Sequence, residues 1–248
     1  MIDFEKKANE IINKKILIVN GQKFRFHEIE FYYYSKKHLD VSCHKNEMQM
    51  SNDQWYFHRM GKKKEDGYKG GTYKGLDMTI GSEKNKNYGG ILIRTIQDCD
   101  TEEIIEGPCK CVNKILEICK KTSIKELVDT ISLNIYDNDM LYIEEDKKLK
   151  KIKIKTGTRV GLTLAKKDMD KWIFQPYRYL TKYVKKEMWG SILLNQKIYK
   201  KDKKWVNRLP KYLEYCETGK HLNDIGNYKK LKTVSDKCIC FGYYSKNN

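Results

Sequence analysis

The amino-acid sequence predicts an α+β fold in which helices pack against a curved, mostly antiparallel β-sheet. Short apolar, β-branched segments bounded by turn-like residues are typical of strands, and they outnumber the segments with helical periodicity. The 248 residues, 40% of them hydrophobic, are sufficient for one large domain. With three prolines and no repeat or low-complexity linker, we expect one compact domain, residues 1–184, and an extension, residues 185–248.

The first predicted elements are a short helix and two strands. Helical spacing of apolar residues favours an amphipathic helix over residues 4–15. Its apolar face contains Phe4, Ala8, Ile11 and Ile12. Residues 16–20 predict a strand, and the aromatic-rich residues 23–34 predict a longer one after a turn at Asn20 and Gly21. A period of two places these residues on one face of the long strand: Phe24, Phe26, Glu28 and Glu30.

Further strands and one more helix complete the predicted domain. We expect strands at residues 54–60, 72–80, 90–96, 140–143, 151–155 and 159–164. Gly107 and Pro108 open a predicted helix, because proline is tolerated in the first helical turn. Its apolar stripe contains Cys111, Ile115, Ile118 and Cys119. The extension is basic and aromatic and is expected to be helical, with Trp189, Trp205, Tyr212 and Tyr215.

The charge of the chain points to a polyanionic partner. Fifty Lys and Arg residues against 33 Asp and Glu residues give a formal charge of +17. Such a surplus concentrates phosphates around a protein, so nucleic acid is the leading candidate. A lysine-rich proteome would produce the same composition. No apolar run approaches the roughly 20 residues of a membrane span, and no signal peptide is recognisable. We expect no membrane partner and an intracellular protein, nuclear if eukaryotic and cytoplasmic if bacterial or viral.

The cysteines do not predict a metal site. Cys109 and Cys111 form one C-x-C pair and Cys238 and Cys240 another, but a zinc site would have to join these distant segments. We therefore expect reduced thiols, no metal and no cofactor. The glycine-bearing loop at residues 61–74 is more suggestive. Its lysines could bind phosphates or be merely solvated: Lys62, Lys63, Lys64, Lys69 and Lys74.

Residues 26–34 offer the chemistry of base excision. Breaking an N-glycosidic bond requires a group that activates water, together with a pocket that receives the flipped base between aromatic side chains. This segment supplies Glu28, Glu30, an imidazole and three consecutive tyrosines. A third carboxylate, Asp77, lies in a predicted strand, where aspartate is disfavoured unless it is paired or functional. Each of these residues also has a structural explanation, such as a paired carboxylate or a packed strand tyrosine.

The segment Glu28-Ile29-Glu30-Phe31-Tyr32 resembles the Glu-Thr-Glu-Ala-Tyr segment of alkyladenine (3-methyladenine) DNA glycosylases. The resemblance implies that Glu30 is the general base and that Tyr32 stacks on the flipped base. It also implies a histidine on the opposite side of the base. His44 matches this position better than its competitor His38, although the spacing is about three residues longer than in the family.

Other pieces of the family follow in the same order, across roughly residues 20–182. The segment 90–94 resembles a strand ending in an arginine near the active site, which assigns Arg94 to the base pocket. The segment 106–110 resembles the Ser-Gly-Pro-Ser-Lys helix entry. Residues 158–161 and 175–179 resemble the Ala-Arg-Val-Gly strand and the final Lys-Pro-Leu-Arg-Phe-Tyr stretch. We expect Lys69, Lys74, Arg159 and Arg178 to contact DNA.

The chain departs from the family at the floor of the base pocket. Thr79 stands where the family has an asparagine, with Asp77 nearby as a second catalytic carboxylate or a partner of Arg94. This departure puts the identity of the excised base in doubt. The family's wedge tyrosine, which fills the gap left by the flipped nucleotide, has Tyr68 and Tyr73 as candidates.

The sequence therefore predicts a monofunctional DNA glycosylase of the base-excision-repair type. It would hydrolyse the bond to a damaged or modified base in DNA, with duplex DNA as the expected substrate and no assigned oligomeric state. A lysine Schiff-base lyase is less favoured, because no lysine stands out. The sequence also allows a non-catalytic nucleic-acid-binding protein on the same fold, or an N-glycosidase of free nucleosides or nucleotides.

Overall fold

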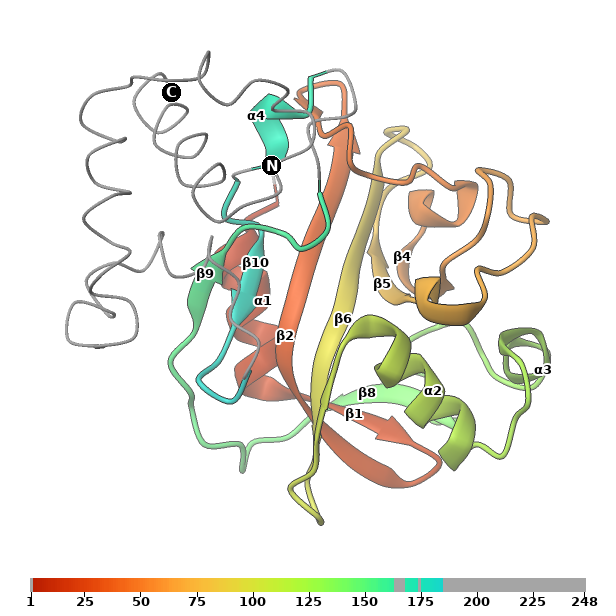
Figure 1. Cartoon of the computed structure of the whole chain (residues 1–248), viewed down its shortest axis with the longest axis vertical. Helices are drawn as coiled ribbons and strands as arrows, with labels where there is room; N and C mark the ends of the chain where they lie inside the picture. Colours follow the sequence, from red (N-terminus) through yellow and green to blue (C-terminus); the bar gives the residue numbers. More distant parts are fainter. Residues whose placement is uncertain (1, 163–167, 174, 185–248) are drawn as a thin grey trace. The chain divides into compact units, whose positions relative to one another are not determined.

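A computed structural model describes residues 2–162, 168–173 and 175–184 of the chain. The chain divides into two compact units, one of Met1–Ile154 with Arg178–Lys186 and one of Lys155–Tyr177 with Glu187–Asn248. The predicted C-terminal extension, residues 185–248, lies outside the described residues. The first unit contains the sheet and the main helices, and it carries the candidate site (Figure 1).

The first unit is built on one antiparallel sheet, which confirms the predicted α+β class (Figure 1). In sheet order its strands are β4 (Asn52–Phe57), β5 (Leu76–Ile80), β6 (Tyr88–Asp98), β2 (Gln22–Ser35), β1 (Lys15–Val19) and β8 (Leu141–Glu145). Short strands β3 (His38–Leu39) and β10 (Arg178–Leu180) also pair with β2, and β7 (Ile104–Glu106) pairs with β6. Because β1 covers only the first residues of β2, β10 pairs with the same edge farther along, at residues 28–30.

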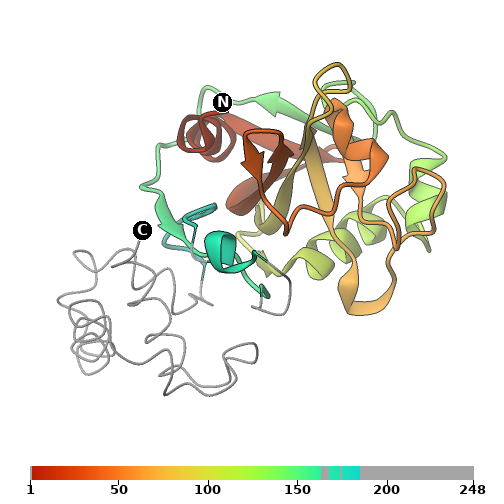
Figure 2. The same ribbon diagram turned by 90° about the horizontal axis from the view of Figure 1, so that it is seen from above.

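Helix α1 (Phe4–Lys14) covers one face of β2 (Figure 2). The Asp3 side chain caps its first turn by accepting a hydrogen bond from the Lys6 amide at 2.9 Å. Phe4 stacks on Phe31 with ring centroids 4.7 Å apart. Neighbouring strand residues point to opposite faces, so Glu30 points away from α1. The aromatic residues of β2 thus divide into a packed set and a set on the candidate-site face.

Helix α2 (Pro108–Ile118) packs beside β6 (Figures 1 and 2). Gly107, with φ at +115°, makes the turn that a side chain would strain, and its amide donates to the Arg94 carbonyl at 2.7 Å. Pro108 occupies the first helical turn, as predicted. The inward face of α2 includes Cys111, where burial raises the pKa of the thiol to about 12.

The most consequential irregularity of the sheet lies where β2 crosses β6. Phe26 pairs with Ile96 and Glu28 with Thr95, so His27 is an extra residue on β2. Ile29 then pairs with Ile93, which leaves Arg94 as an extra residue on β6. Such bulges re-aim side chains. The predicted period of two, with the two phenylalanines on the face of Glu28 and Glu30, therefore does not run unbroken along this strand.

The predicted elements match the structure well in the first half of the chain and less well after residue 140. Residues 72–75 precede β5 instead of belonging to it, because 3-10 helix η2 (Gly71–Tyr73) occupies this position. The strand predicted at 151–155 is wrong, since residues 151–154 are irregular and β9 (Lys155–Gly157) follows them. Residues 159–162 do not start a strand, because residues 160 and 161 form a turn and their two neighbours are irregular. Helix α3 (Ile124–Val128) was not predicted.

The second unit is described only in part. Besides β9 it contains the short helix α4 (Asp170–Ile173). Arg159 is buried within it, where its guanidinium donates to the Trp172 carbonyl at 3.2 Å and lies 5.2 Å from the centre of the Tyr177 ring. Among the described residues of both units, no helix combines the length and apolar character needed to cross a bilayer.

We predict that His27 makes the fold sensitive to mild acid. Burial lowers its pKa from 6.5 to about 4, and its ring nitrogens contact Thr181 Oγ1 and Gln97 Oε1, each at 2.8 Å. Between these two pH values the imidazole of His27 is protonated in the unfolded chain and neutral in the folded chain. Stability should therefore fall as pH drops from 6.5 to 4, by at most about 3 kcal/mol from this residue.

Urea unfolding at pH 7, 5.5 and 4 measures this dependence. In His27→Gln the free energy of unfolding should fall less steeply between pH 6.5 and 4. His38→Gln, which alters another buried histidine, should leave the part of the pH dependence that comes from His27 unchanged. Equal slopes for the wild type and His27→Gln would contradict the prediction.

Candidate active site

The centre of the candidate site consists of two glutamates of β2 and one arginine of β6. Arg94 Nε donates to Glu28 Oε1 at 2.9 Å and lies 3.4 Å from Glu30 Oε1. Arg94 Nη1 lies 3.5 Å from Glu30 Oε2. Both carboxylates are buried, and Glu30 is fully so. One guanidinium therefore bridges two buried carboxylates on the same face of the sheet.

A second arginine and a hydroxyl hold Glu28. Arg178 Nε, from β10, donates to Glu28 Oε1 at 2.7 Å, and Thr95 Oγ1 donates to Glu28 Oε2 at 2.6 Å. Burial alone would raise the pKa of Glu28, but the charges of Arg178 and Arg94 and the Thr95 hydroxyl hold it below its ordinary value. Burial would likewise lower the pKa of Arg94, but Glu30 and Glu28 raise it above the ordinary value. Glu28 and Arg94 are therefore charged at neutral pH.

The bulges explain how one arginine reaches both glutamates. In a regular ladder, consecutive residues of β6 point to opposite faces. Here both Arg94 and Thr95 contact Glu28, because Arg94 is the extra residue on β6. Bulges often occur next to active sites for this reason.

Tyr32 lies on the same face, two residues beyond Glu30. Its hydroxyl donates to Glu30 Oε2 at 2.8 Å, and its side chain is half-buried. Its ring therefore lies at the boundary between the buried carboxylates and the surface. The structure brings together Glu30, Tyr32 and Arg94, three residues selected from the sequence.

Asp77 shares this face but not these partners. Leu92 of β6 pairs with Glu30 on one side and with Asp77 on the other, and directly paired residues point the same way. Asp77 Oδ1 lies 2.7 Å from His58 Nε2, and Asp77 Oδ2 accepts from the Gln49 amide at 3.3 Å. The expectation that Asp77 binds Arg94 is thus replaced by an aspartate–histidine pair.

His44 belongs to the same cluster through Tyr56 of β4. His44 Nδ1 lies 2.7 Å from the Tyr56 hydroxyl, and Tyr56 pairs with Asp77 across the sheet. Burial and the Asp77 carboxylate raise the pKa of Tyr56, so its hydroxyl stays protonated. The competing candidate, His38, packs against Phe4 of α1 with ring centroids 6.0 Å apart. This contact places it beside α1, away from Glu30.

Thr79 is buried and serves the adjoining strand. Its hydroxyl accepts from the Gln54 amide at 2.9 Å and lies 3.1 Å from Ser51 Oγ. These contacts support the irregular pairing at the start of β4, between Asn52 and Trp55. Thr79 therefore performs a structural task at the position where the sequence suggested a pocket floor.

The four predicted DNA contacts occupy different environments. Lys69 is half-buried in the basic loop, and Lys74 donates to Asn113 Oδ1 at 2.7 Å. Arg178 and Arg159 are both buried. A buried guanidinium committed to Glu28 does not fit the predicted role of Arg178 as a DNA contact, and the burial of Arg159 likewise does not fit that role.

Sequence reasoning missed the partners that hold the carboxylates. Arg178 lies 150 residues from Glu28, and no spacing rule connects them. No sequence pattern singled out His58, whose ring lies against Gly75 in the structure, where a Cβ would lie 2.6 Å from His58 Nδ1. Among the described residues, no three His, Cys, Asp or Glu side chains are arranged to hold a metal ion.

The chain is similar to a viral protein. "Uncharacterized protein L759" of Acanthamoeba polyphaga mimivirus is 42% identical to this chain over 189 residues. The alignment covers 71% of this chain and 85% of the mimivirus protein. No family model matches the chain.

We predict that Arg178→Met destabilises the protein by about 3 kcal/mol, because it removes one of the two cations that compensate the buried Glu28. Equilibrium urea unfolding at pH 7 measures the loss. Lys182→Met, an equivalent change at an exposed position, should cost less than about 0.5 kcal/mol.

A double-mutant cycle separates the ion pair from lost packing. Glu28→Gln combined with Arg178→Met should cost less than the sum of the single changes, since no unpaired carboxylate remains. The proposed pairing would be contradicted if the two losses of unfolding free energy were additive. It would also be contradicted if Arg178→Met cost no more stability than Lys182→Met.

Proposed function

This chain and the mimivirus protein belong to one family, and we propose that this chain is a monofunctional DNA glycosylase. It would flip a damaged or modified base out of duplex DNA and hydrolyse the N-glycosidic bond, without metal or cofactor. The resemblance to alkyladenine DNA glycosylases suggests that the curved sheet adopts the fold of that family. The single observation that carries the proposal is the buried Glu30 carboxylate, held by Arg94 and by the Tyr32 hydroxyl.

This arrangement suits a general base that activates water. A general base must lie within hydrogen-bond reach of the proton that it removes, and its orientation must be fixed. Arg94 and Tyr32 fix the Glu30 carboxylate from two directions. Glu30 would lie nearest to the positive charge that develops on the sugar, while Arg94 and Arg178 offset the repulsion between the two glutamates. The Tyr32 ring, adjacent to the carboxylate, offers an aromatic face to a flipped base.

The loop at residues 61–74 provides a surface for the DNA backbone. Lys62, Lys63 and Lys64 are exposed there, close in sequence to His58 and Asp77. Tyr73 is 77% exposed, whereas Tyr68 is held by Arg59, whose guanidinium lies 4.1 Å from the centre of its ring. Their exposure favours Tyr73 over Tyr68 as the side chain that enters the gap left by a flipped nucleotide.

The basic extension adds to this electrostatic attraction. Residues 185–248 contain 15 Lys and Arg and six Asp and Glu, so more than half of the formal charge of +17 belongs to about a quarter of the chain. We propose that this segment contributes sequence-independent phosphate contacts.

We predict that Glu30→Gln slows base release by at least about 100-fold while leaving DNA affinity within about threefold, because the amide cannot accept the proton of water. Mass spectrometry of bases released from methylated, deaminated and otherwise modified duplexes measures the rate. Glu145→Gln, at an exposed position on β8, serves as the matched control. Tight DNA binding with no base released from any duplex would instead favour a non-catalytic binding protein.

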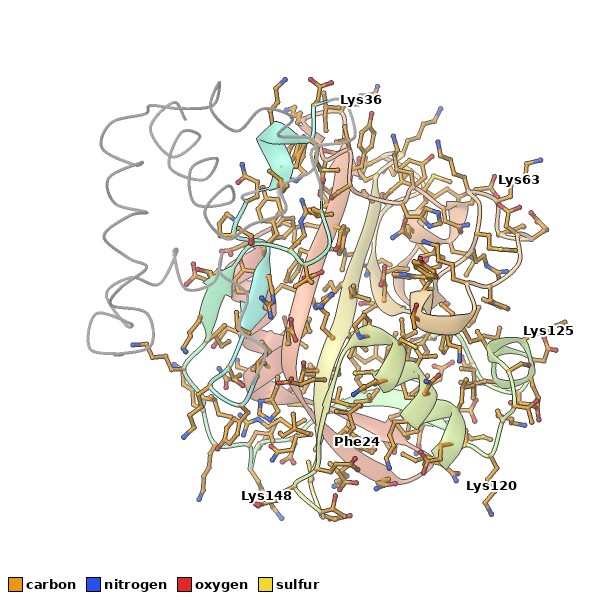
Figure 3. All side chains as sticks on the ribbon, in the orientation of Figure 1. Phe24, Lys36, Lys63, Lys120, Lys125 and Lys148 are labelled. Atoms are coloured by element: carbon orange, nitrogen blue, oxygen red, sulfur yellow. The ribbon has the colours of Figure 1, made fainter. Side chains whose placement is uncertain are left out.

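The basic loop makes a second prediction. Replacing Lys62, Lys63 and Lys64 by Gln should weaken duplex binding and reduce the slope of log K against log salt concentration by up to about 2.7. The same three changes at Lys147, Lys148 and Lys150, which are also exposed, form the control. Figure 3 shows Lys63 and Lys148 on opposite sides of the view. Equal slope changes for both triple variants would contradict a localised DNA surface.

A further inference from the structure

We propose that Lys45 binds a backbone phosphate of the flipped nucleotide, on the same face of the sheet as Glu30 and Tyr32. This inference rests on the proposed glycosylase function and adds a phosphate site to it. Lys45 lies outside the basic loop at residues 61–74, and the sequence motifs did not select it. It would hold the sugar–phosphate backbone beside the base pocket itself.

The ammonium group of Lys45 rests on an aromatic ring of β2. Lys45 Nζ lies 4.2 Å from the centre of the Tyr34 ring. Such a contact attracts a cation without neutralising its charge. Within the part of the chain that the structure describes, no carboxylate pairs with this ammonium group. Lys45 therefore presents an uncompensated positive charge at a position that the ring defines.

Tyr34 places this charge next to the proposed base pocket. Beyond its bulge, β2 pairs with β6 in an unbroken register, so residues two apart on β2 share a face. Tyr33 packs against α1, which puts Tyr32 and Tyr34 on the opposite face with Glu30. Two residues span about 7 Å of a strand. Lys45 therefore lies over the residue next to Tyr32 on this face, and Tyr32 carries the ring proposed to stack on the flipped base.

This end of the face reaches the surface. Tyr32, Tyr34 and Lys45 are all half-buried, so each is partly open to solvent. The row that runs from Glu30 across the sheet is different, because Leu92 is only 5% exposed there. A nucleotide can therefore approach the two tyrosines and the lysine together from solvent.

The segment that carries Lys45 is tied both to the site face and to the basic loop. His44 Nδ1 lies 2.7 Å from the Tyr56 hydroxyl of β4. The buried Asn46 side chain donates to two carbonyl groups of the basic loop, at 3.0 and 2.8 Å. Between these contacts the backbone at Lys45 is left-handed, with φ at +59°, and turns the segment. Lys45 and the exposed lysines of the loop therefore hold fixed positions relative to one another.

A phosphate is the group that suits this position. A flipped nucleotide rotates about its backbone and keeps a phosphate on each side. A lysine offers three N–H donors and a point charge to such a group. Contact with one of these phosphates would hold the rotated backbone in place while Glu30 acts at the bond to the base. Lys45 is thus a binding residue and takes no part in proton transfer.

Binding to DNA whose phosphates are altered one at a time tests this assignment. The probes are duplexes with one tetrahydrofuran residue, a stable nucleotide that lacks a base, in which the phosphate on either side is replaced by methylphosphonate. One of the two replacements should weaken binding of the wild type by about fivefold, as expected for the loss of one ionic contact. Lys45→Asn should lose the same affinity on the unmodified duplex and should not respond further to that methylphosphonate.

The variant is chosen to remove the charge and keep the backbone. Asparagine adopts the left-handed conformation more readily than most residues, so the thermal midpoint of Lys45→Asn should match that of the wild type. The slope of log K against log salt concentration should fall in magnitude by about 0.9, the value for one phosphate. Lys45→Arg should retain the response to methylphosphonate. Lys148→Asn, at an exposed position, is the control and should behave as the wild type.

The contrary outcomes differ from one another. Equal losses from methylphosphonate in the wild type and in Lys45→Asn would overturn the assignment, as would a wild type that is indifferent to both replacements. A loss of affinity in Lys45→Asn that accompanies a lower thermal midpoint, without coupling to either phosphate, would show a structural role and overturn it too. Coupling of Lys45 to one phosphate, with no base released from any modified duplex, would support the phosphate site and overturn the glycosylase.

Discussion

The fold accommodates buried charge in the middle of a β-sheet, and the candidate site depends on how that charge is balanced. Glu28 and Glu30 would repel each other and resist burial if they stood alone. Arg94 bridges them, and Arg178 adds a second cation from a strand that joins the sheet much later in the chain. The cost of burying these ions is offset only when all of the partners are present, which gives the site a single defined geometry.

The sheet irregularities and the ion network are parts of the same arrangement. A regular ladder would place Arg94 and Thr95 on opposite faces, and one of them would lose Glu28. The two extra residues, His27 on β2 and Arg94 on β6, change the register of the strands so that the side chains of Arg94 and Thr95 both reach Glu28. His27 then occupies a buried position between Thr181 and Gln97, where it stays neutral. One local backbone feature thus orients an arginine and buries a histidine.

Local sequence patterns predicted the class of fold and the central strands, because apolar alternation and turn residues act over short distances. The segment containing Glu30 and Tyr32 was selected because its carboxylates and tyrosines are close in sequence and resemble a family motif, and the structure brings these two residues together with Arg94. The partners that determine their environment were not identifiable. Arg178 approaches Glu28 through tertiary folding alone, and residues 151–155 alternate like a strand although most of them are irregular. His58 followed no motif, because its contact with Asp77 depends on the pairing of β4 with β5.

The placement of β10 has a consequence for how the protein is made. During translation the first 177 residues leave the ribosome before the strand that carries Arg178, so β1, β2 and β6 can pair while Glu28 still lacks one of its two cations. A nascent or truncated chain of that length holds Glu28, Glu30 and Arg94 without the full charge balance that fixes them. The site therefore reaches its final geometry only after β10 has been synthesised and has joined the edge of β2.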